Sequence, residues 1–566
     1  MVPPASACSG VTRLAWLLVA FLWLAGCGRA EVPEARAQRE GGGHKATAPA
    51  PAPPLRGPAY GDALIEGSIG DASNLIPILA ADSASHNIGG LIYNGLVKYD
   101  RDLNIVGDLA ESWQVSPDGL ALTFRLRQGV RWHDGHPLTA EDVHFTYRVL
   151  VDRKTPTAYA EDFLQVAKAE VLDPHTFRVR YRQPYAKALI SWAVSILPRH
   201  RLEGQDLTKT PLARRPVGTG PYRFVEWKTG EKIVLEANPD YFEGRPFLYR
   251  YVYRIIPDQA TMFLELKARS LDMMGLTPLQ YARQTTRPEL QARFRRYRYA
   301  AFAYTYLGYN LRHPRFRDRR VRQAISYAID QQELIQGVLL GLGQPATGPY
   351  RPGTWAYNPH VQRYPHDPER ARALLREAGW RDTDGDGILD RDGRPFAFTI
   401  LTNQGNESRA KTAELIQWRL RKVGIAVKIR TVEWAAFVNE FLDKRRFEAV
   451  VLGWRTGQDP DLYNVWHSSK TGPKQLNFIG FRHPEVDRLL EQGRRTLDRT
   501  ERKRSYDAFQ AILAEEQPYT FLDVPDALTI VHGRVRGIEP APAGLTYNFI
   551  RWYVPRDEQL YAALVP

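Results

Sequence analysis

The fold is decided by the stretch Glu111-Ser-Trp-Gln-Val-Ser-Pro-Asp-Gly-Leu-Ala-Leu-Thr-Phe-Arg-Leu-Arg-Gln-Gly-Val-Arg-Trp-His-Asp-Gly135, which continues as His136-Pro-Leu-Thr-Ala-Glu-Asp-Val143. Within it, Ser116-Pro-Asp-Gly119 predicts a turn, because Pro presets φ and Gly supplies a positive φ. The apolar residues Leu122, Phe124 and Leu126 alternate with polar ones, which predicts a half-buried strand.

A second turn and a capped helix follow that strand. His133-Asp-Gly135 predicts the turn. Thr139 is a good N-cap, and Asp142 stands at the third helical position, so we expect a helix from Ala140 through Tyr147. The order is therefore turn, strand, turn and capped helix.

This block closely resembles the signature of the family 5 extracellular solute-binding proteins, which are the peptide-, oligopeptide- and nickel-binding receptors of bacterial ABC importers. Gly218-Thr-Gly-Pro-Tyr222 and Asn238-Pro-Asp-Tyr-Phe-Glu-Gly-Arg-Pro246 also match the family, and the resemblance covers about Asp62 to Tyr553. It implies an α/β protein with the two-lobed periplasmic-binding-protein fold and an extra subdomain inserted in the first lobe.

The resemblance also implies a domain plan. The expected segments are 61–102, 211–303 and 527–566 for lobe I, 103–210 for its inserted subdomain, and 304–526 for lobe II. The chain should cross between the lobes near residue 300 and again near Val524 to Asp526. These two crossings would form the hinge.

The N-terminal residues predict export and anchoring. Arg13 precedes the apolar run Leu14–Gly26, which has the length of a signal peptide and is short for a membrane span. The run ends at Cys27 in a sequence resembling a bacterial lipobox, so we expect residues 1–27 to be a lipoprotein signal peptide and Cys27 to be lipidated. An ordinary secretory signal is the alternative. Residues 28–60, rich in Ala, Pro and Gly, are expected to be a disordered tether at the periplasmic or extracellular face.

The composition is that of a globular protein with a substantial core: 11% of the 566 residues are aromatic and 25% are charged. A net charge of +14 would permit nucleic-acid contacts, but Lys and Arg are dispersed and no nucleic-acid-binding motif is present. We expect no nucleic-acid partner. The only cysteines are Cys8 and Cys27, so disulfides are not expected in the folded part.

Alternating strands and helices from residue 396 to 452 predict a parallel sheet in the second lobe. The expected strands are 396–401, 427–430 and 447–452, and the helices between them are centred on an apolar face at 413–423 and on 434–441. Ligands in such sheets bind beyond the carboxyl ends of the strands. The loops Thr402–Glu407 and Gly453–Tyr463 are therefore the predicted ligand loops.

These loops supply six candidate ligand-binding residues: Asn403, Gln404, Trp454, Arg455, Asp459 and Asp461. A ring, a cation and two carboxylates can hold a zwitterion without covalent chemistry. The alternative is that Asp459-Pro-Asp461 is only a turn and Trp454 only core. The resemblance favours the ligand role, because this loop lines the cleft in the family.

The resemblance also bears on the ligand. Dipeptide-binding members place an Asp three residues after the Trp, where this chain has Gly457, and many place an Arg near the position of Asn403 and Gln404. The form seen here resembles members that take longer peptides. The predicted ligand is an oligopeptide, and the predicted partners are ABC permease subunits and, through them, ATPase subunits. The protein is expected to be a monomer.

An aspartate-rich string raises the possibility of calcium. Asp382, Asp384, Asp386, the Ile388 carbonyl and Asp390 have the spacing of a calcium loop. The twelfth position should carry a bidentate acid and has Gly393. The missing ligand favours a pair of Asx-Gly turns, and any calcium site here would be weak and structural. No other cofactor is expected.

No catalytic residues are predicted. His133 and Asp134 are adjacent, and adjacent side chains rarely reach one substrate atom; no Gly-x-Ser-x-Gly or His-Glu-x-x-His motif occurs. His467 is a lone candidate nickel ligand for which a structural role is favoured. The alternatives to an oligopeptide receptor are a receptor for a nickel chelate or an oligosaccharide, a surface hydrolase, and a calcium-dependent adhesion protein.

Overall fold

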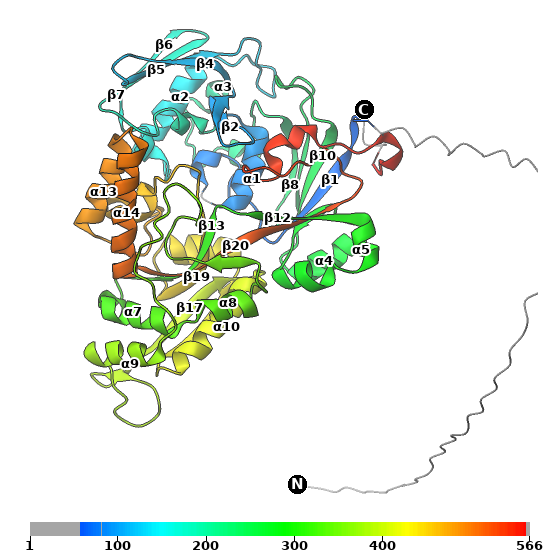
Figure 1. The fold of residues 1–566 in the computed structure, drawn as a ribbon. Coiled ribbons are helices and arrows are strands. Elements are labelled where there is room, and N and C mark those ends of the chain that lie inside the picture. The colour runs from blue at the N-terminus through cyan, green and yellow to red at the C-terminus, as the bar shows by residue number, and fades with distance from the viewer. Residues whose placement is uncertain (1–56, 81, 562–566) are drawn as a thin grey trace, which may run out of the picture. The chain divides into compact units, whose positions relative to one another are not determined.

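The computed structural model describes residues 57–80 and 82–561 (Figure 1). The predicted signal peptide, Cys27 and residues 28–56 of the predicted tether lie outside the described residues. Of that tether, residues 57–60 are described, and the ring of Tyr60 packs 4.8 Å from the ring of Phe247. None of the helices in the described ranges combines the length and apolarity needed to cross a membrane.

The structure confirms the turn, strand and helix of the signature stretch. Strand β5 (Ala121–Leu126) follows the turn and pairs with β4 (Ala110–Val115). Helix α2 (Ala140–Val151) has Thr139 as its N-cap, and the backbone N–H of Thr139 donates to the Asp142 carboxylate at 2.9 Å. β5 forms because one of its faces is buried, and α2 begins where it does because its first turn is capped.

These elements belong to a small antiparallel sheet in the order β4-β5-β7-β6. Its other strands are β6 (Val166–Asp173) and β7 (Thr176–Tyr181). The fully buried ring of Trp192 packs against Phe124 and Phe177. That core is continuous with the core beneath β1 (Gly61–Ser68), so the small sheet and the start of the chain share one hydrophobic interior.

A larger sheet runs through the rest of the protein in the order β18-β17-β19-β13-β20-β11-β1-β10-β9-β8. One half contains β1 with β8 (Tyr222–Lys228), β9 (Lys232–Ala237), β10 (Leu248–Ile255) and β11 (Met273–Gly275). The other half contains β13 (Ala303–Tyr309), β17 (Ala397–Asn403), β18 (Ala426–Val432) and β19 (Ala449–Arg455). Each half has hydrophobic clusters of its own.

The parallel arrangement predicted for the second half holds for three strands. β17 is parallel to both β18 and β19, whereas β13 is antiparallel to β19, so this half of the sheet is mixed. Helix α10 (Glu407–Arg421) connects β17 to β18 as expected. The second predicted helix is a short α11 (Trp434–Ala436) that continues as a π-helical turn over Phe437–Leu442.

Strand β20 (Tyr519–His532) joins the two halves. Its first part pairs with β13 and its last part with β11 and β12 (Phe294–Ala300), while the short β14 (Gly343–Pro345) pairs with its middle. In Figure 1, β20 runs from the yellow strands of one half to the blue β1 of the other. The chain also passes between the halves in the short link from β12 to β13.

The remaining regular elements cover the sheets or lie at their edges. Two further two-stranded sheets are formed by β2 (Val97–Tyr99) with β3 (Ile105–Gly107) and by β15 (Asp390–Arg391) with β16 (Arg394–Pro395). The other α-helices are α1 (Ser83–Ile92), α3 (Arg199–Leu202), α4 (Gln259–Lys267), α5 (Pro288–Arg293), α6 (Pro314–Arg317), α7 (Arg319–Ala328), α8 (Gln331–Gly337), α9 (Pro368–Glu377), α12 (Tyr463–Trp466), α13 (Pro484–Arg495) and α14 (Arg499–Glu516).

A buried ion cluster ties the last part of the chain to the first. Arg534 is 3% exposed, contacts the carboxylate of Asp62, and donates to Asp272 at 2.7 Å and to the Ala63 carbonyl at 2.9 Å. Asp272 also accepts from the backbone N–H of Ile65 in β1. Three segments far apart in sequence thus meet at one guanidinium.

Candidate functional site

Asn403 and Gln404 lie where β17 ends. Asn403 is buried, and its side-chain oxygen accepts a hydrogen bond from Arg409 Nη1 at 2.8 Å, while its amide nitrogen donates to the Gln404 carbonyl. The Gln404 side chain is exposed. Arg409, on the first turn of α10, was not among the candidate residues, although it supplies a cation that contacts Asn403.

Trp454 and Arg455 occupy the last positions of the neighbouring strand β19. The indole Nε1 of Trp454 donates to the Tyr519 hydroxyl at 3.3 Å, and its ring lies 5.9 Å from that of Phe478. Arg455 is exposed and reaches the opposite half of the protein, where its Nη1 lies 3.4 Å from the side-chain oxygen of Asn87 in α1. One residue thus packs within its own lobe and the other reaches across.

The loop after β19 lines a cavity of about 390 Å³ between the two lobes. The second lobe contributes four residues: Gly457, Gln458, Asp459 and Asp461. The first lobe and the small-sheet region contribute the rest: Pro77, Ile78, His86, Tyr99, Tyr159, Asp162, Phe163, Lys187, Ile190, Ser191, Ala193, Val194 and Ser195. Of the six candidate residues, Asp459 and Asp461 line this cavity, and the other four do not.

Both aspartates are already held by cations of the protein. Asp461 is 1% exposed and accepts a hydrogen bond from Arg494 Nε at 2.8 Å, with Lys187 Nζ at 3.3 Å. Asp459 binds Arg502, whose Nη2 lies 3.1 Å from each carboxylate oxygen. Burial alone would raise the pKa of Asp461, but Arg494 and Lys187 outweigh burial and hold that pKa well below its usual value.

The same ion pairs bridge the two lobes. Arg494, near the end of α13, donates to Asp162 at 2.7 Å, and its carbonyl accepts from the backbone N–H of Ala186 at 2.7 Å. Lys470 pairs with Glu161 at 2.5 Å. Sequence reasoning missed these partners, because they carry no motif and Asp162 and Arg494 are 332 positions apart.

His86 and Tyr159 form a neutral polar corner of the cavity. His86 Nε2 lies 3.0 Å from the Ala80 carbonyl and 2.9 Å from the Tyr159 hydroxyl, which itself donates to Ala80. Burial lowers the pKa of His86, and the nearby Asp82 offsets this only in part. The imidazole is therefore neutral at pH 7 and adds no charge to the cavity.

His133 and Asp134 do not form a catalytic pair. The Nδ1 of His133 accepts from the backbone N–H of Gly218 at 3.2 Å, and its Nε2 donates to the Gly220 carbonyl at 3.0 Å. Asp134 turns instead to His200, at 2.8 Å. His133 therefore connects the signature stretch to the Gly218–Gly220 segment, which is a structural role.

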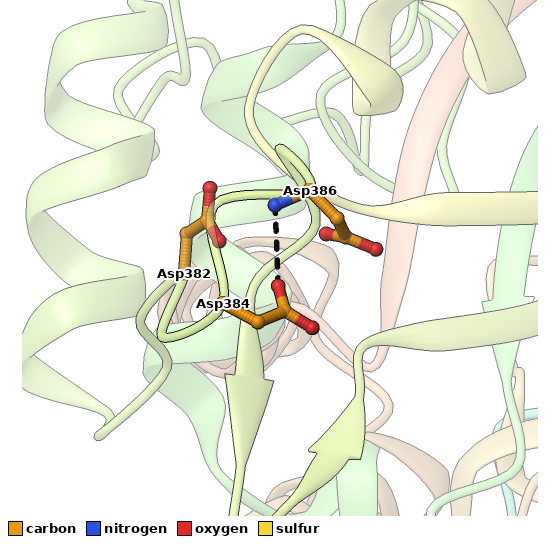
Figure 2. Close-up of side chains that lie close together, drawn as sticks. All are labelled: Asp382, Asp384 and Asp386. Carbon is orange, nitrogen blue, oxygen red and sulfur yellow. Dashed lines mark hydrogen bonds between the residues drawn. The ribbon is translucent and has the colours of Figure 1, made fainter.

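The candidate calcium loop brings three carboxylates together, as Figure 2 shows. Asp382, Asp384 and Asp386 are exposed, and one oxygen from each lies within 4.8 Å of the others. Each carboxylate also accepts backbone N–H groups of the loop, including that of Asp386 on Asp384 at 3.2 Å. The carboxylate of Asp390 accepts from Thr383, and the Ile388 side chain is buried. These are the bonds of Asx turns.

His467, the candidate nickel ligand, is held within its own lobe. Its ring stacks on Tyr463 at 4.0 Å, and its Nδ1 lies 2.7 Å from the Ser469 hydroxyl. It belongs to no group of three metal-ligating side chains in the part of the chain that the structure describes.

Comparison with known proteins gives a consistent result. The model of the bacterial extracellular solute-binding proteins, family 5, middle, matches residues 104–475. The chain is 35% identical over 513 residues to the oligopeptide-binding protein AppA of Bacillus subtilis, covering 88% of this chain and 93% of that protein. The solved structure of AppA from Bacillus subtilis in complex with a nonapeptide superposes with a TM-score of 0.84 at 34% identity, covering 88% of this chain and 100% of that one.

A second solved structure, NikZ from Campylobacter jejuni in complex with Ni(L-His), superposes with a TM-score of 0.80 at 27% identity. The likeness covers 87% of this chain and 99% of NikZ. The two-lobed fold and the signature stretch thus agree with the family match and with these likenesses. The chain belongs to family 5 of the bacterial extracellular solute-binding proteins.

Proposed function

We propose that this protein captures oligopeptides between its two lobes and delivers them to the permease subunits of an ABC importer, whose ATPase subunits drive uptake. The observation that carries the proposal is the cavity of about 390 Å³ whose walls come from both lobes. A ligand held there contacts both lobes only when they are shut, so closure can report occupancy to the permease. The likeness to AppA, which was solved with a nonapeptide, supports a peptide as the cargo.

The proposal includes a lipid anchor. Diacylation of Cys27, followed by the tether of residues 28–60, would hold the receptor at the outer surface of the membrane, since two acyl chains give stable anchoring where one does not. Replacing Cys27 by Ser should then release the protein from the membrane fraction and change its migration. Retention in the membrane fraction with unchanged migration would contradict the anchor and leave the ligand proposal intact.

A nickel chelate is the second candidate, favoured by the likeness to NikZ. Among the cavity-lining residues, His86 is the only histidine, and its Nε2 already faces Ala80 and Tyr159. An oligosaccharide would use the aromatic walls of the cavity. Neither candidate requires catalysis.

The decisive experiment is native mass spectrometry of the purified protein, followed by identification of the molecules released on denaturation. Closed clefts retain cargo, so we expect a ladder of masses corresponding to peptides. If the released molecule is a metal chelate or a sugar, the family assignment stands and the proposal that the cargo is a peptide is wrong. If no cargo is found, calorimetry with peptides of two to nine residues tests the same point, and we expect binding only by the longer ones.

A further inference from the structure

We infer that the interlobe cavity accepts an uncharged apolar or aromatic side chain of the bound peptide, and that the ammonium group of the peptide is not held there by charge. This inference rests on the proposed function and specifies the ligand that the site selects. It is carried by the pairing of every charge that lines the cavity and by the chemistry of the remaining walls.

The charges around the cavity are balanced. Its three carboxylates are Asp162, Asp459 and Asp461, and the cations Lys187, Arg494 and Arg502 contact them at 2.7 to 3.3 Å. The carboxylate of Asp162 accepts three hydrogen bonds, from Lys187 at 2.8 Å, Arg494 at 2.7 Å and the Tyr185 hydroxyl at 2.7 Å. A further ammonium would therefore find its acceptors occupied and Lys187 close by.

Bringing such an ammonium into the cavity would be unfavourable. Removing an ion from water costs several kcal/mol unless a hydrogen-bonded counter-ion awaits it. Here each counter-ion is already committed, and separating an existing pair would leave another buried charge without a partner. A ligand group without charge avoids both penalties.

The other walls favour an apolar group. Ile78, Phe163, Ile190 and Val194 present aliphatic and aromatic surface, and Tyr99 and Tyr159 add rings that carry hydroxyls. Burying a Leu or Phe side chain against such walls contributes roughly 1.5 to 3 kcal/mol. The cavity is therefore suited to a large uncharged side chain.

Gly457 gives direct experimental access to the charge balance. It lines the cavity, and a side chain there would meet no atom closer than the Asp459 carbonyl, 4.0 Å from the position of its Cβ. Gly457→Asp adds one carboxylate without removing any existing contact. Gly457→Asn adds the same volume without charge and is the matched control.

The test measures affinities of the purified full chain by calorimetry for alanine-based nonapeptides. Each peptide carries one Phe, Leu, Lys or Glu at successive positions and is made with a free or an acetylated amino terminus. We expect one position at which Phe and Leu bind at least tenfold tighter than Lys and Glu. Acetylation should change the affinity less than threefold in the original protein and in Gly457→Asn, and should weaken binding at least tenfold in Gly457→Asp.

Two results would overturn the inference, and they separate it from the proposed function. If peptides bind but the original protein prefers the free amine, or Lys at the selective position, tenfold or more, the charge argument fails and the peptide receptor stands. If none of the peptides binds to any of the three proteins, the proposed function fails, and the inference fails with it.

Discussion

At the scale of single residues, His133 makes the stability depend on pH. Burial is the main cause that lowers the pKa of His133 from an ordinary 6.5 to about 4; the hydrogen bond to Gly220 opposes burial, and Arg223 adds to it. Between these values the unfolded chain binds a proton that the folded protein does not, so the free energy of unfolding falls as the pH falls from 7 toward 4. Across the whole interval between its unfolded and folded pKa values, His133 changes the free energy of unfolding by at most about 3 kcal/mol.

We expect His133→Asn to flatten this dependence. Between pH 7 and pH 5 the free energy of unfolding of the original protein should fall by about 2 kcal/mol more than that of the variant. Urea titrations at both pH values measure the difference. Replacing the exposed His360 by Asn is the control, and a His133→Asn curve parallel to that control would contradict the assignment.

Glycine is needed at position 218 because the backbone of α1 approaches it closely, and not because the position has an unusual φ. A Cβ at this position would overlap the Ile92 carbonyl at the end of α1, and Gly218 is absent from the residues with positive φ. Because backbone cannot move aside as a flexible side chain can, Gly218→Ala should lower the free energy of unfolding by roughly 3 kcal/mol or more.

The matched control is Gly90→Ala in α1, where a Cβ meets no atom within 4 Å. Alanine is the better helix former, so this change should raise stability by about 0.5 to 1 kcal/mol. Thermal unfolding of the two variants compares them. Equal effects would show that glycine is not required at 218.

At the scale of elements, helix α13 holds the lobes together through Arg494. This side chain is 5% exposed and contacts Asp461 of its own lobe and Asp162 of the other. Arg494→Met leaves both carboxylates with Lys187 as their remaining cation, so the free energy of unfolding should fall by about 3 to 5 kcal/mol. The neighbouring Arg495→Met removes only an exposed pair with Glu491 and should cost less than about 1 kcal/mol.

A double-mutant cycle distinguishes an ion pair from lost packing. If Arg494 acts through Asp162, adding Asp162→Asn to Arg494→Met should cost less than the sum of the single changes, with a coupling of about 1 to 3 kcal/mol. Additive effects would show that the contact between the lobes does not depend on this pair.

The aspartate-rich loop before β15 allows a second test at this scale. Its carboxylates accept the backbone N–H groups of Gly385, Gly387 and Ile388, which fixes the turns without an ion. We therefore expect the melting temperature to be unchanged by EDTA and by millimolar calcium. A rise of several degrees with calcium, abolished in Asp384→Asn, would instead establish a structural site.

Elements set by local chemistry could be predicted from the sequence. The turn at Ser116–Gly119, the strand after it and the cap at Thr139 depend on neighbours within a few positions, and the structure contains all three. The two ligand loops were predicted instead from the order of strands and helices, and of the two only Gly453–Tyr463 lines the cavity. The partners of Asp461 could not be predicted, since Arg494 and Lys187 reach it from distant elements and only the assembled lobes bring them together.

At the scale of the whole molecule, Gly405 lies just after β17, where the backbone of one lobe closely approaches Pro257 of the other. Its φ is +83°, and a Cβ would overlap the Pro257 carbonyl of the opposite lobe. Gly405→Ala should hold the lobes apart and make the free energy of closure less favourable by about 1 to 3 kcal/mol. Ligand binding should then weaken by roughly 5- to 150-fold. Calorimetry with the cargo identified by mass spectrometry measures the effect.

Gly393→Ala controls for backbone strain, because Gly393 also has a positive φ, +65°, and a Cβ there meets no atom within 4 Å. Both variants should lose similar folding stability, and only Gly405→Ala should lose affinity and show a larger radius of gyration with ligand. Unchanged affinity in Gly405→Ala would show that the closed state tolerates a side chain at this contact.

The guanidinium of Arg534 has a consequence for how the protein is made. A nascent chain emerges from the ribosome amino end first, so Asp62 in β1 is synthesised 472 positions before Arg534, the cation that neutralises its carboxylate. The second lobe carries its own hydrophobic clusters and can fold while the first still waits with Asp62 and Asp272 unpaired. The lobe that contains β1 is therefore the last to be completed, and a chain truncated just before Arg534 has one finished lobe attached to an open one, a ready substrate for proteases.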